Sequence, residues 1–242
     1  MSGHSHFAGI KHKKETTDSQ RGKIFSKLTR EISIAARGGT NPETNTKLRV
    51  VIEKAKSLNM PKENIERAIN KGSGEAEGEQ LAEVLFEAYG PGGIAILMEG
   101  ITDNNKRTVN EIKQILNQNG GKFVESGSVK WLFERKGIIT VSVVEENAPL
   151  TREDLELKAI EAGAEDFYWH NSILDVYTKP ENLETIKKSL EAAGIKTDSA
   201  SLGWVPKEDV IVSEKDKEAC QRLFEALDEN DAITEIYSNI QE

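Results

Sequence analysis

The sequence has few of the residues from which reactive or cross-linked sites are built. It contains one cysteine, Cys220, so neither a disulfide within the chain nor a cysteine-clustered zinc site can form. Cys220 shares a helical face with Leu223, Phe224 and Leu227, which predicts a buried apolar side chain. Walker loops, nucleotide-binding glycine fingerprints, nucleophile elbows and His-Glu-x-x-His motifs are also missing. We therefore expect a protein that is not an enzyme and that holds no cofactor and no metal.

Long apolar runs are equally scarce. No stretch approaches the ~18 apolar residues that a transmembrane helix requires. The basic N-terminal run MSGHSHFAGIKHKK lacks the apolar segment of a secretory signal. Its first two histidines, His4 and His6, could take up copper or nickel, and adventitious binding is the favoured interpretation. We expect a cytoplasmic protein without membrane contact.

The charge is unevenly distributed along the chain, whose net charge is −9. Residues 1–72 contain 15 Lys and Arg against 7 Asp and Glu, a net of +8. That leaves 17 against 34, a net of −17, for residues 73–242. A basic end on an acidic body indicates that one end meets a polyanion, while the acidic body is available to a protein partner.

Three amphipathic helices are predicted in the basic part. Apolar residues recur at helical spacing over residues 19–37, 41–59 and 61–72. We expect Asn41 to be the N-cap of the second helix, and Gly72 to be the left-handed residue that follows the third. Three short helices of this kind form a small bundle.

The domain boundaries follow from composition and element order. The acidic segment SGEAEGEQ reads as a linker, so residues 1–79 are predicted to form a basic helical domain with a flexible N-terminal tail. Strands VLFEAY and IAILMEG then flank a glycine-rich turn, followed by a helix over 105–118 and a third strand, VKWLFER. This α/β domain is predicted to span residues 80–136 and 208–242, because the C-terminal strand VIVS, helix 214–227 and strand AITEIY need partners upstream.

A third domain is predicted as an insertion within the second. Residues 137–207 show the order β-α-β-β-α-β, which is that of the ferredoxin-like sandwich, an antiparallel sheet covered by two helices. The fold class is therefore α+β, with a three-helix N-terminal domain followed by two α/β sandwich domains.

Cations follow one face of the first predicted helix. Lys23, Lys27, Arg30 and Arg37 lie opposite its apolar face with no carboxylate among them, at a spacing that suits a phosphate backbone. An ordinary solvated helix face is the alternative interpretation. We expect charge reversal at Lys23, Lys27 and Arg30 to abolish polyanion binding without unfolding the bundle.

Further cations precede this helix. Lys11, Lys13, Lys14 and Arg21 lie, with Phe7, in a segment too poor in apolar residues to fold alone, so we expect it to be disordered until bound. Cations with an aromatic residue suit phosphate contact and base stacking on RNA. A merely solubilising tail is the alternative.

Two weaker possibilities concern local motifs. The second and third helices could form a helix-turn-helix that reads DNA, but a plain hairpin is favoured because Glu63 and Glu66 would face phosphates. The run from Thr102 to Asn105 reads as a helix N-terminus that could bind an anion, although Asp103 competes for its amides.

Several runs together resemble one known family. GHSHFAGIKHKK, RGKIFSKLTREISIAARGG, NMPKENIERAINKG, YGPGG, TDNNKRT, GGKFVESGSVKWLF and ITEIYSN are similar to the YebC family over the whole chain. The family pairs a helical first domain with two α/β domains. It is described as comprising probable bacterial transcriptional regulators and a mitochondrial branch that activates translation. His6 and Phe7 stand where the family usually has Lys and Trp.

The resemblance implies a nucleic-acid-directed regulator of gene expression. Its basic surface would be carried by Lys11, Lys13, Lys14, Arg21, Lys23, Lys27 and Arg30. We favour a ribosome-associated translation factor that docks on ribosomal RNA, with a DNA-binding transcriptional regulator as the alternative. The sequence shows no convincing dimerisation seam, so a monomer is favoured and a dimer is left open.

Overall fold

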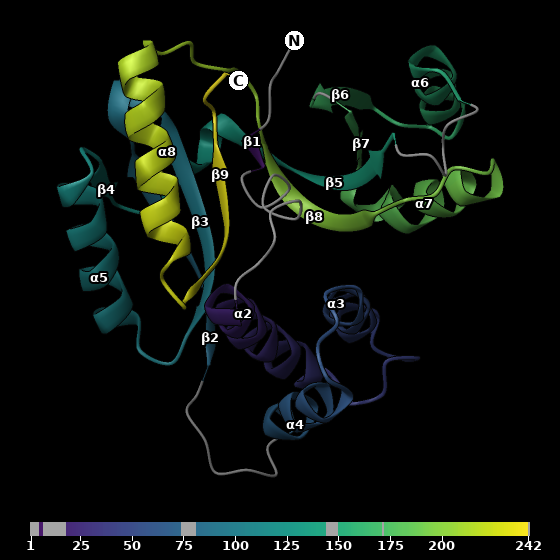
Figure 1. The fold of residues 1–242 in the computed structure, drawn as a ribbon, viewed down its shortest axis with the longest axis horizontal. Coiled ribbons are helices and arrows are strands. Elements are labelled where there is room, and N and C mark those ends of the chain that lie inside the picture. The colour runs from purple at the N-terminus through teal and green to yellow at the C-terminus, as the bar shows by residue number, and fades with distance from the viewer. Residues whose placement is uncertain (1–4, 7–17, 74–80, 144–149, 171, 242) are drawn as a thin grey trace. The chain divides into compact units, whose positions relative to one another are not determined.

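The structure, a computed structural model, describes residues 5–6, 18–73, 81–143, 150–170 and 172–241 (Figure 1). These fall into two compact units. The smaller unit is Leu132–Asp209, and the larger unit consists of Ser5–Trp131 with Val210–Ile240. The larger unit contains a helical domain and, after it, a second domain built on a sheet.

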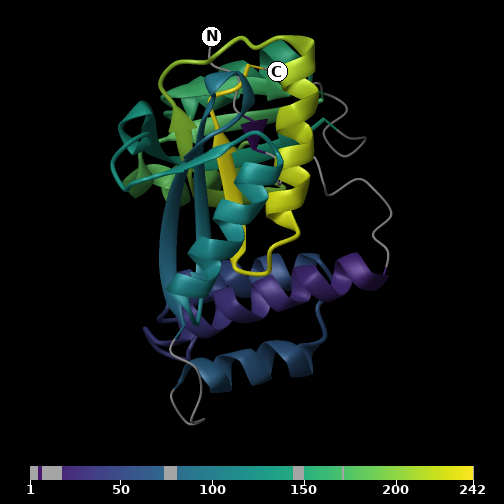
Figure 2. The same cartoon turned by 90° about the vertical axis from the view of Figure 1, so that its left-hand side faces the viewer.

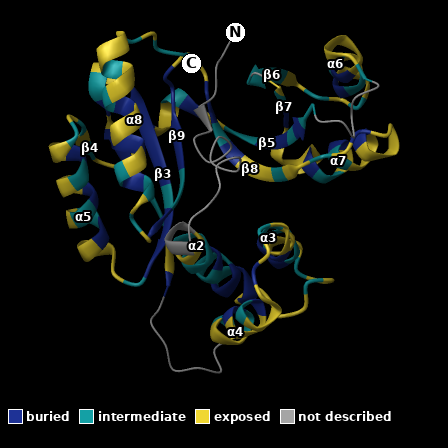
Figure 3. Ribbon diagram, viewed as in Figure 1, coloured by how far each residue is buried: buried dark blue, intermediate teal, exposed yellow. Residues whose placement is uncertain are grey.

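The helical domain consists of α2 (Asp18–Ala36), α3 (Thr46–Ser57) and α4 (Lys62–Gly72). Their apolar faces meet in one core, as the spacing predicts. The buried side chains include Leu28, Ile32, Leu48, Ile52, Ile65 and Ala68. The outward faces of α3 and α4 are exposed (Figure 3).

The predicted start of the second helix is wrong. Asn41 lies in a turn, and Asn45 is the N-cap, with its side chain accepting from the Leu48 amide at 3.1 Å. The Asn45 side chain also donates to the carbonyl oxygens of Ala35 and Gly39 at 2.7 Å each. One amide side chain thus satisfies the end of α2 and the beginning of α3, which Asn41 does not do.

Gly72 has a different role from the one predicted. It is the last residue of α4, and Ser73 follows it with an ordinary right-handed φ of −70°. A Cβ atom on Gly72 would lie 2.2 Å from the Ser33 carbonyl oxygen. Glycine is required there because α4 closely approaches α2, where Ser33 also donates to the Ala68 carbonyl at 2.9 Å.

The second domain is a five-stranded antiparallel sheet in the order β1-β9-β3-β2-β4. Its strands are β1 (Ser5–His6), β2 (Ala82–Tyr89), β3 (Ala95–Thr102), β4 (Lys122–Val124) and β9 (Ile233–Ser238). Helices α5 (Asn105–Gln118) and α8 (Glu214–Asp228) lie on one face of the sheet and close its core (Figure 2). The turn from β2 to β3, with its 3-10 segment Pro91–Gly93, contains two glycines with positive φ.

Cys220 lies in this core, which confirms the predicted burial. Its side chain is 1% exposed, and its thiol donates to the Pro91 carbonyl at 3.4 Å. Burial raises the pKa of the thiol to about 11, and the negative charge of Asp216 adds to the shift. The sulfur is therefore protonated at neutral pH and acts as core packing.

Two predicted strands of this domain are wrong. The third strand is β4 (Lys122–Val124), whereas Lys130–Leu132 forms a 3-10 turn and Phe133 begins β5. The segment VIVS contributes only an isolated parallel bridge between Val210 and Ile240. The first run is divided between a 3-10 turn and the start of β5, which pairs with β8 of the smaller unit, and the second is held by a single bridge. Periodicity alone does not distinguish these arrangements from one continuous strand.

The loop between β4 and β5 is held by a buried carboxylate. Glu87 of β2 is 1% exposed and accepts hydrogen bonds from the amides of Gly127, Val129 and Lys130 at 2.6, 2.7 and 3.0 Å. Burial alone would raise its pKa, but these hydrogen bonds outweigh it and lower the pKa below the ordinary value.

The smaller unit has the predicted ferredoxin-like order. It contains β5 (Phe133–Ser142), α6 (Arg152–Glu161), β6 (Asp166–His170), β7 (Ile173–Thr178), α7 (Leu183–Ala192) and β8 (Ser199–Pro206), with a 3-10 turn at Pro180–Asn182. The sheet order is β6-β7-β5-β8 with antiparallel neighbours. Residues of α6 and α7 share one core with the sheet. The α+β fold class, with three helices followed by two antiparallel α/β domains, is confirmed.

Candidate nucleic-acid interface

The predicted cations are divided between described and undescribed parts of the chain. Lys11, Lys13 and Lys14 lie outside the described residues. Arg21 is exposed on the first turn of α2. Lys23, Lys27, Arg30 and Arg37 follow it along and just past the helix, and the structure gives each of these four a partner in the second domain.

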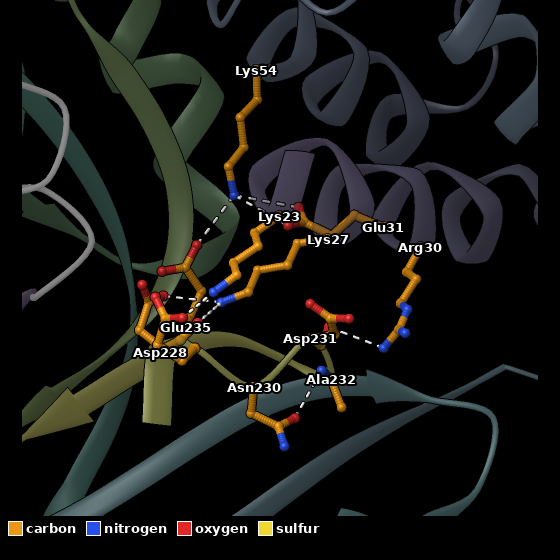
Figure 4. A network of polar contacts seen from close by, with 11 residues as sticks. Lys23, Lys27, Arg30, Glu31, Lys54, Asp228, Asn230, Asp231, Ala232 and Glu235 are labelled. Atoms are coloured by element: carbon orange, nitrogen blue, oxygen red, sulfur yellow. Dashed lines mark hydrogen bonds and ion pairs between the residues drawn. The ribbon is translucent and has the colours of Figure 1, made fainter. Parts of the chain in front are cut away.

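Lys23 and Lys27 meet the end of α8. Lys23 forms an ion pair with Glu229, and Lys27 donates to the Asp228 carboxylate at 3.0 Å and to its backbone carbonyl at 2.7 Å (Figure 4). The Lys27 side chain is only 12% exposed. These contacts belong to an acidic turn, residues 228–231, which connects α8 to β9.

The two arginines meet backbone oxygens. Arg30 donates to the carbonyls of Asp231 at 3.0 Å and Ile101 at 3.3 Å, and Arg37 donates to the Leu81 carbonyl at 2.6 Å. Both interpretations of this face, phosphate contact and an ordinary solvated face, left out the contacts within the chain that the structure shows. Reversing Lys23, Lys27 and Arg30 would disturb the junction of the helical and second domains, so it cannot test polyanion binding by itself.

A third lysine is shared by two carboxylates at the same junction. Lys54 of α3 lies 3.3 Å from Glu31 of α2 and 3.2 Å from Glu235 of β9 (Figure 4). Although its own burial favours the neutral form, the negative charges of Glu235 and Glu31 raise the pKa of Lys54 above its ordinary value. Burial raises the pKa of Glu31, and the positive charge of Lys54 opposes that shift.

These pairings were missed because their partners are remote in sequence. Lys27 and Asp228 are separated by 201 residues. The signal available was the run Asp-Glu-Asn-Asp at 228–231, an acidic block complementary to the cationic face of α2. A helix periodicity identifies which residues share a face, but not what that face contacts.

A second group of cations remains open to solvent. We call Arg21, Lys56, Arg67 and Lys71 the open set. Their side chains are exposed and make no hydrogen bond or ion pair with the part of the chain that the structure describes. Arg67 and Lys71 lie on α4, beside the exposed carboxylates Glu63 and Glu66.

Thr102–Asn105, the predicted helix N-terminus, is the capped start of α5. Asn104 is the N-cap and accepts from the Arg107 amide at 3.1 Å, while its own amide donates to Thr102 Oγ1 at 3.0 Å. Asp103 forms an ion pair with the Arg107 guanidinium at 2.5 Å. Desolvation opposes ionisation of Asp103, but its backbone hydrogen bond and the charges of Arg107 and Arg30 lower its pKa overall.

Comparison with known proteins decides the family. A model of the TACO1/YebC N-terminal domain matches residues 5–75, and a model of the TACO1/YebC second and third domains matches residues 81–240. The chain belongs to the TACO1/YebC family. Its members' shared architecture therefore includes the helical domain and the two α/β domains described above.

TACO1/YebC relatives match at full length. The chain is 45% identical over 242 residues to a protein of Caldanaerobacter subterraneus named "Probable transcriptional regulatory protein", covering all of this chain and 98% of the relative. An Aquifex aeolicus protein of the same name is 47% identical, covering all of this chain and 96% of the relative. The crystal structure of a conserved hypothetical protein from Aquifex aeolicus matches with a TM-score of 0.88 and 46% identity, over 96% of this chain and 95% of that one.

Among the described residues of this TACO1/YebC protein, no group of histidine, cysteine or acidic side chains has a geometry suited to a metal ion. None of the helices in the described segments combines the length and apolarity needed to cross a membrane.

Proposed function

We propose that this protein is a nucleic-acid-binding regulator of gene expression that acts in the cytoplasm as a ribosome-associated translation factor and catalyses no reaction. Its helical domain docks on ribosomal RNA, as a monomer, and the acidic α/β domains face a protein partner. The relatives' name, "Probable transcriptional regulatory protein", supports the general role in regulating gene expression.

The observation that carries this proposal is the open set of cations. Residues 1–72 have a net charge of +8, and the junction engages Lys23, Lys27, Arg30 and Arg37. Arg21, Lys56, Arg67 and Lys71 remain exposed without a partner in the described segments. Exposed cations of this kind contact phosphates and release counterions when they bind.

The exposed face of α4 favours RNA docking over DNA reading. In a helix-turn-helix, α4 would enter the major groove and its side chains would approach base edges and phosphates. Glu63 and Glu66 are exposed on that helix and would meet the phosphates of duplex DNA. Docking on folded RNA by shape and charge does not require a whole helix to enter a groove.

Co-sedimentation with purified ribosomes at moderate salt tests this proposal. The unmodified chain is compared with R21Q/K56Q/R67Q and with K11Q/K13Q/K14Q, each with and without excess duplex DNA. The matched control is K179Q/K188Q, which removes two exposed lysines of the smaller unit.

Saturable ribosome binding that resists duplex DNA, and that falls in either test variant but not in the control, is the expected result. Displacement by DNA together with sequence-selective duplex binding would instead establish the DNA-binding transcriptional regulator. Absence of binding to both polyanions would overturn the nucleic-acid role itself.

A further inference from the structure

A polar cleft lies within the larger unit, between the helical domain and the second domain. Its volume is 410 Å³. The lining residues are Ser26, Thr29, Arg30, Lys71, Leu81, Asp103 and Arg107. They come from α2, the last turn of α4, the residue before β2 and the start of α5, so residues remote in sequence converge on one space.

The lining is cationic. Arg30, Lys71 and Arg107 are opposed by one carboxylate, Asp103, which gives the lining a formal charge of +2. Leu81 is the apolar side chain of the lining, so the cleft is unsuited to a hydrophobic ligand. Its size and charge match a phosphate group carried on a nucleotide.

Two of the cations are held in place. Arg30 uses Nη1 for the carbonyls of Ile101 and Asp231, and its other guanidinium nitrogens have no hydrogen bond with the described residues. Asp103 holds the Arg107 guanidinium at 2.5 Å and so orients it. Arginine in a fixed orientation presents several donors to a phosphate at little further entropic cost.

Lys71 is the free charge of the cleft. It lies in the last turn of α4 and makes no hydrogen bond or ion pair with the described part of the chain. Ser26 likewise has no hydrogen-bond partner there, whereas the Thr29 hydroxyl donates to the Phe25 carbonyl at 2.7 Å. Beside two anchored cations, the Lys71 ammonium is available to an incoming phosphate.

We propose that this cleft is a phosphate-binding site, with Arg30, Lys71 and Arg107 as its cationic ligands and Ser26 as a hydroxyl donor. The phosphate comes either from the backbone of an RNA or from a free nucleotide. Only the RNA source rests on the proposed function. A bound phosphate would contact the helical and second domains together and would stabilise their junction, because a ligand that binds only the assembled site favours it.

Calorimetric titration of the full chain tests the site with three probes: inorganic phosphate, uridine 5′-monophosphate and an eight-nucleotide RNA. The test variant is Lys71→Gln and the matched control is Lys62→Gln, which removes an exposed lysine of the same helix outside the cleft. Loss of one charged ligand is expected to weaken binding about tenfold.

Weaker binding in Lys71→Gln than in Lys62→Gln, with at least one probe, supports the site, and the probe that binds identifies the source. Binding of mononucleotide but not RNA supports the cleft as a free-nucleotide site, independently of ribosome docking. Equal losses in both lysine variants, or no binding of any probe, overturns the site. The ribosome experiment, which uses other variants, then decides the proposed function separately.

Discussion

The helical domain carries two sets of cations that look alike in sequence and differ in structure. Lys23, Lys27, Arg30 and Arg37, which we call the junction set, meet acidic or carbonyl oxygens of the second domain. The open set has no such partner in the described segments. The junction set forms the more regular stripe on its helix, yet the less regular set is the one open to solvent. A regularly spaced cationic helix face therefore indicates a contact surface, but its partner can be another domain of the same chain.

The largest effect is expected from Lys54→Met, which breaks the charge balance at the junction. It leaves Glu31 and Glu235 facing each other without their shared cation. We expect the free energy of unfolding to fall by about 2 kcal/mol, below the usual cost for a fully buried pair because the Lys54 side chain is 39% exposed. Urea unfolding followed by circular dichroism measures the change.

The pH dependence of that variant sharpens the test. The pKa of Glu31 is raised, so its folded form binds a proton more readily than the unfolded chain does. The penalty should be full at neutral pH, and should shrink as pH falls through the raised Glu31 pKa, because protonation removes the repulsion. A deficit that stays equally large from pH 7 down to pH 3 would contradict this account.

Glu87→Gln should have an effect of similar size. The environment of Glu87 differs from that of the junction carboxylates, because three backbone amides hold the Glu87 carboxylate, whereas a cation holds those at the junction. The amide of glutamine offers one acceptor oxygen, so we expect a loss of about 2 kcal/mol. Since the folded pKa is lowered, the contribution of Glu87 is present above its unfolded pKa and is lost as pH falls through the folded one. Stability of the two chains measured from pH 7 to pH 3 should therefore converge at the acidic end.

A smaller stability effect is expected from D228N/E229Q. The change removes the carboxylates that face Lys27 and Lys23, and should cost about 1 kcal/mol because these pairs are partly exposed. It also releases two cations, so affinity for a short RNA should rise and should depend more steeply on salt. Fluorescence anisotropy at two salt concentrations measures this. If RNA affinity stays unchanged, the junction set cannot serve as a second polyanion surface.

The smallest stability effect belongs to the open set. R21Q/K56Q/R67Q should change the free energy of unfolding by less than about 0.5 kcal/mol, because these side chains have no partner in the described segments. Its RNA affinity should fall while its unfolding curve stays in place. A large loss of stability would show that these cations also have structural partners.

Local patterns predicted most elements well. Helix α5 has the predicted limits, because its apolar spacing is clean and turn residues flank it. The isolated bridge at Val210 was predicted as a strand because a short apolar run fits several structures. Both the correct limits of α5 and the error at Val210 follow from local sequence patterns alone.

Features that depend on remote contacts could not be predicted in this way. By its position in the sequence, Gly72 fits a glycine that terminates a helix. The reason why a glycine is needed there, the close approach of α4 to Ser33, is visible only in the structure. Asn45 rather than Asn41 caps α3 because it also reaches the end of α2. The partners of Lys27 and Arg30, and the cleft beside Arg30, depend on how the helical domain packs against a turn about 200 residues away.

The position of β9 in the sheet determines when the second domain can finish folding. β9 lies between β1 and β3, yet it follows the whole of the smaller unit in the chain. During synthesis, residues 132–209 emerge and can form their own sheet while β3 still lacks its neighbour. The acidic turn emerges immediately before β9, so Lys23 and Lys27 also lack their carboxylate partners until then. Until then these two lysines of the helical domain are open to the RNA of the ribosome that is making it.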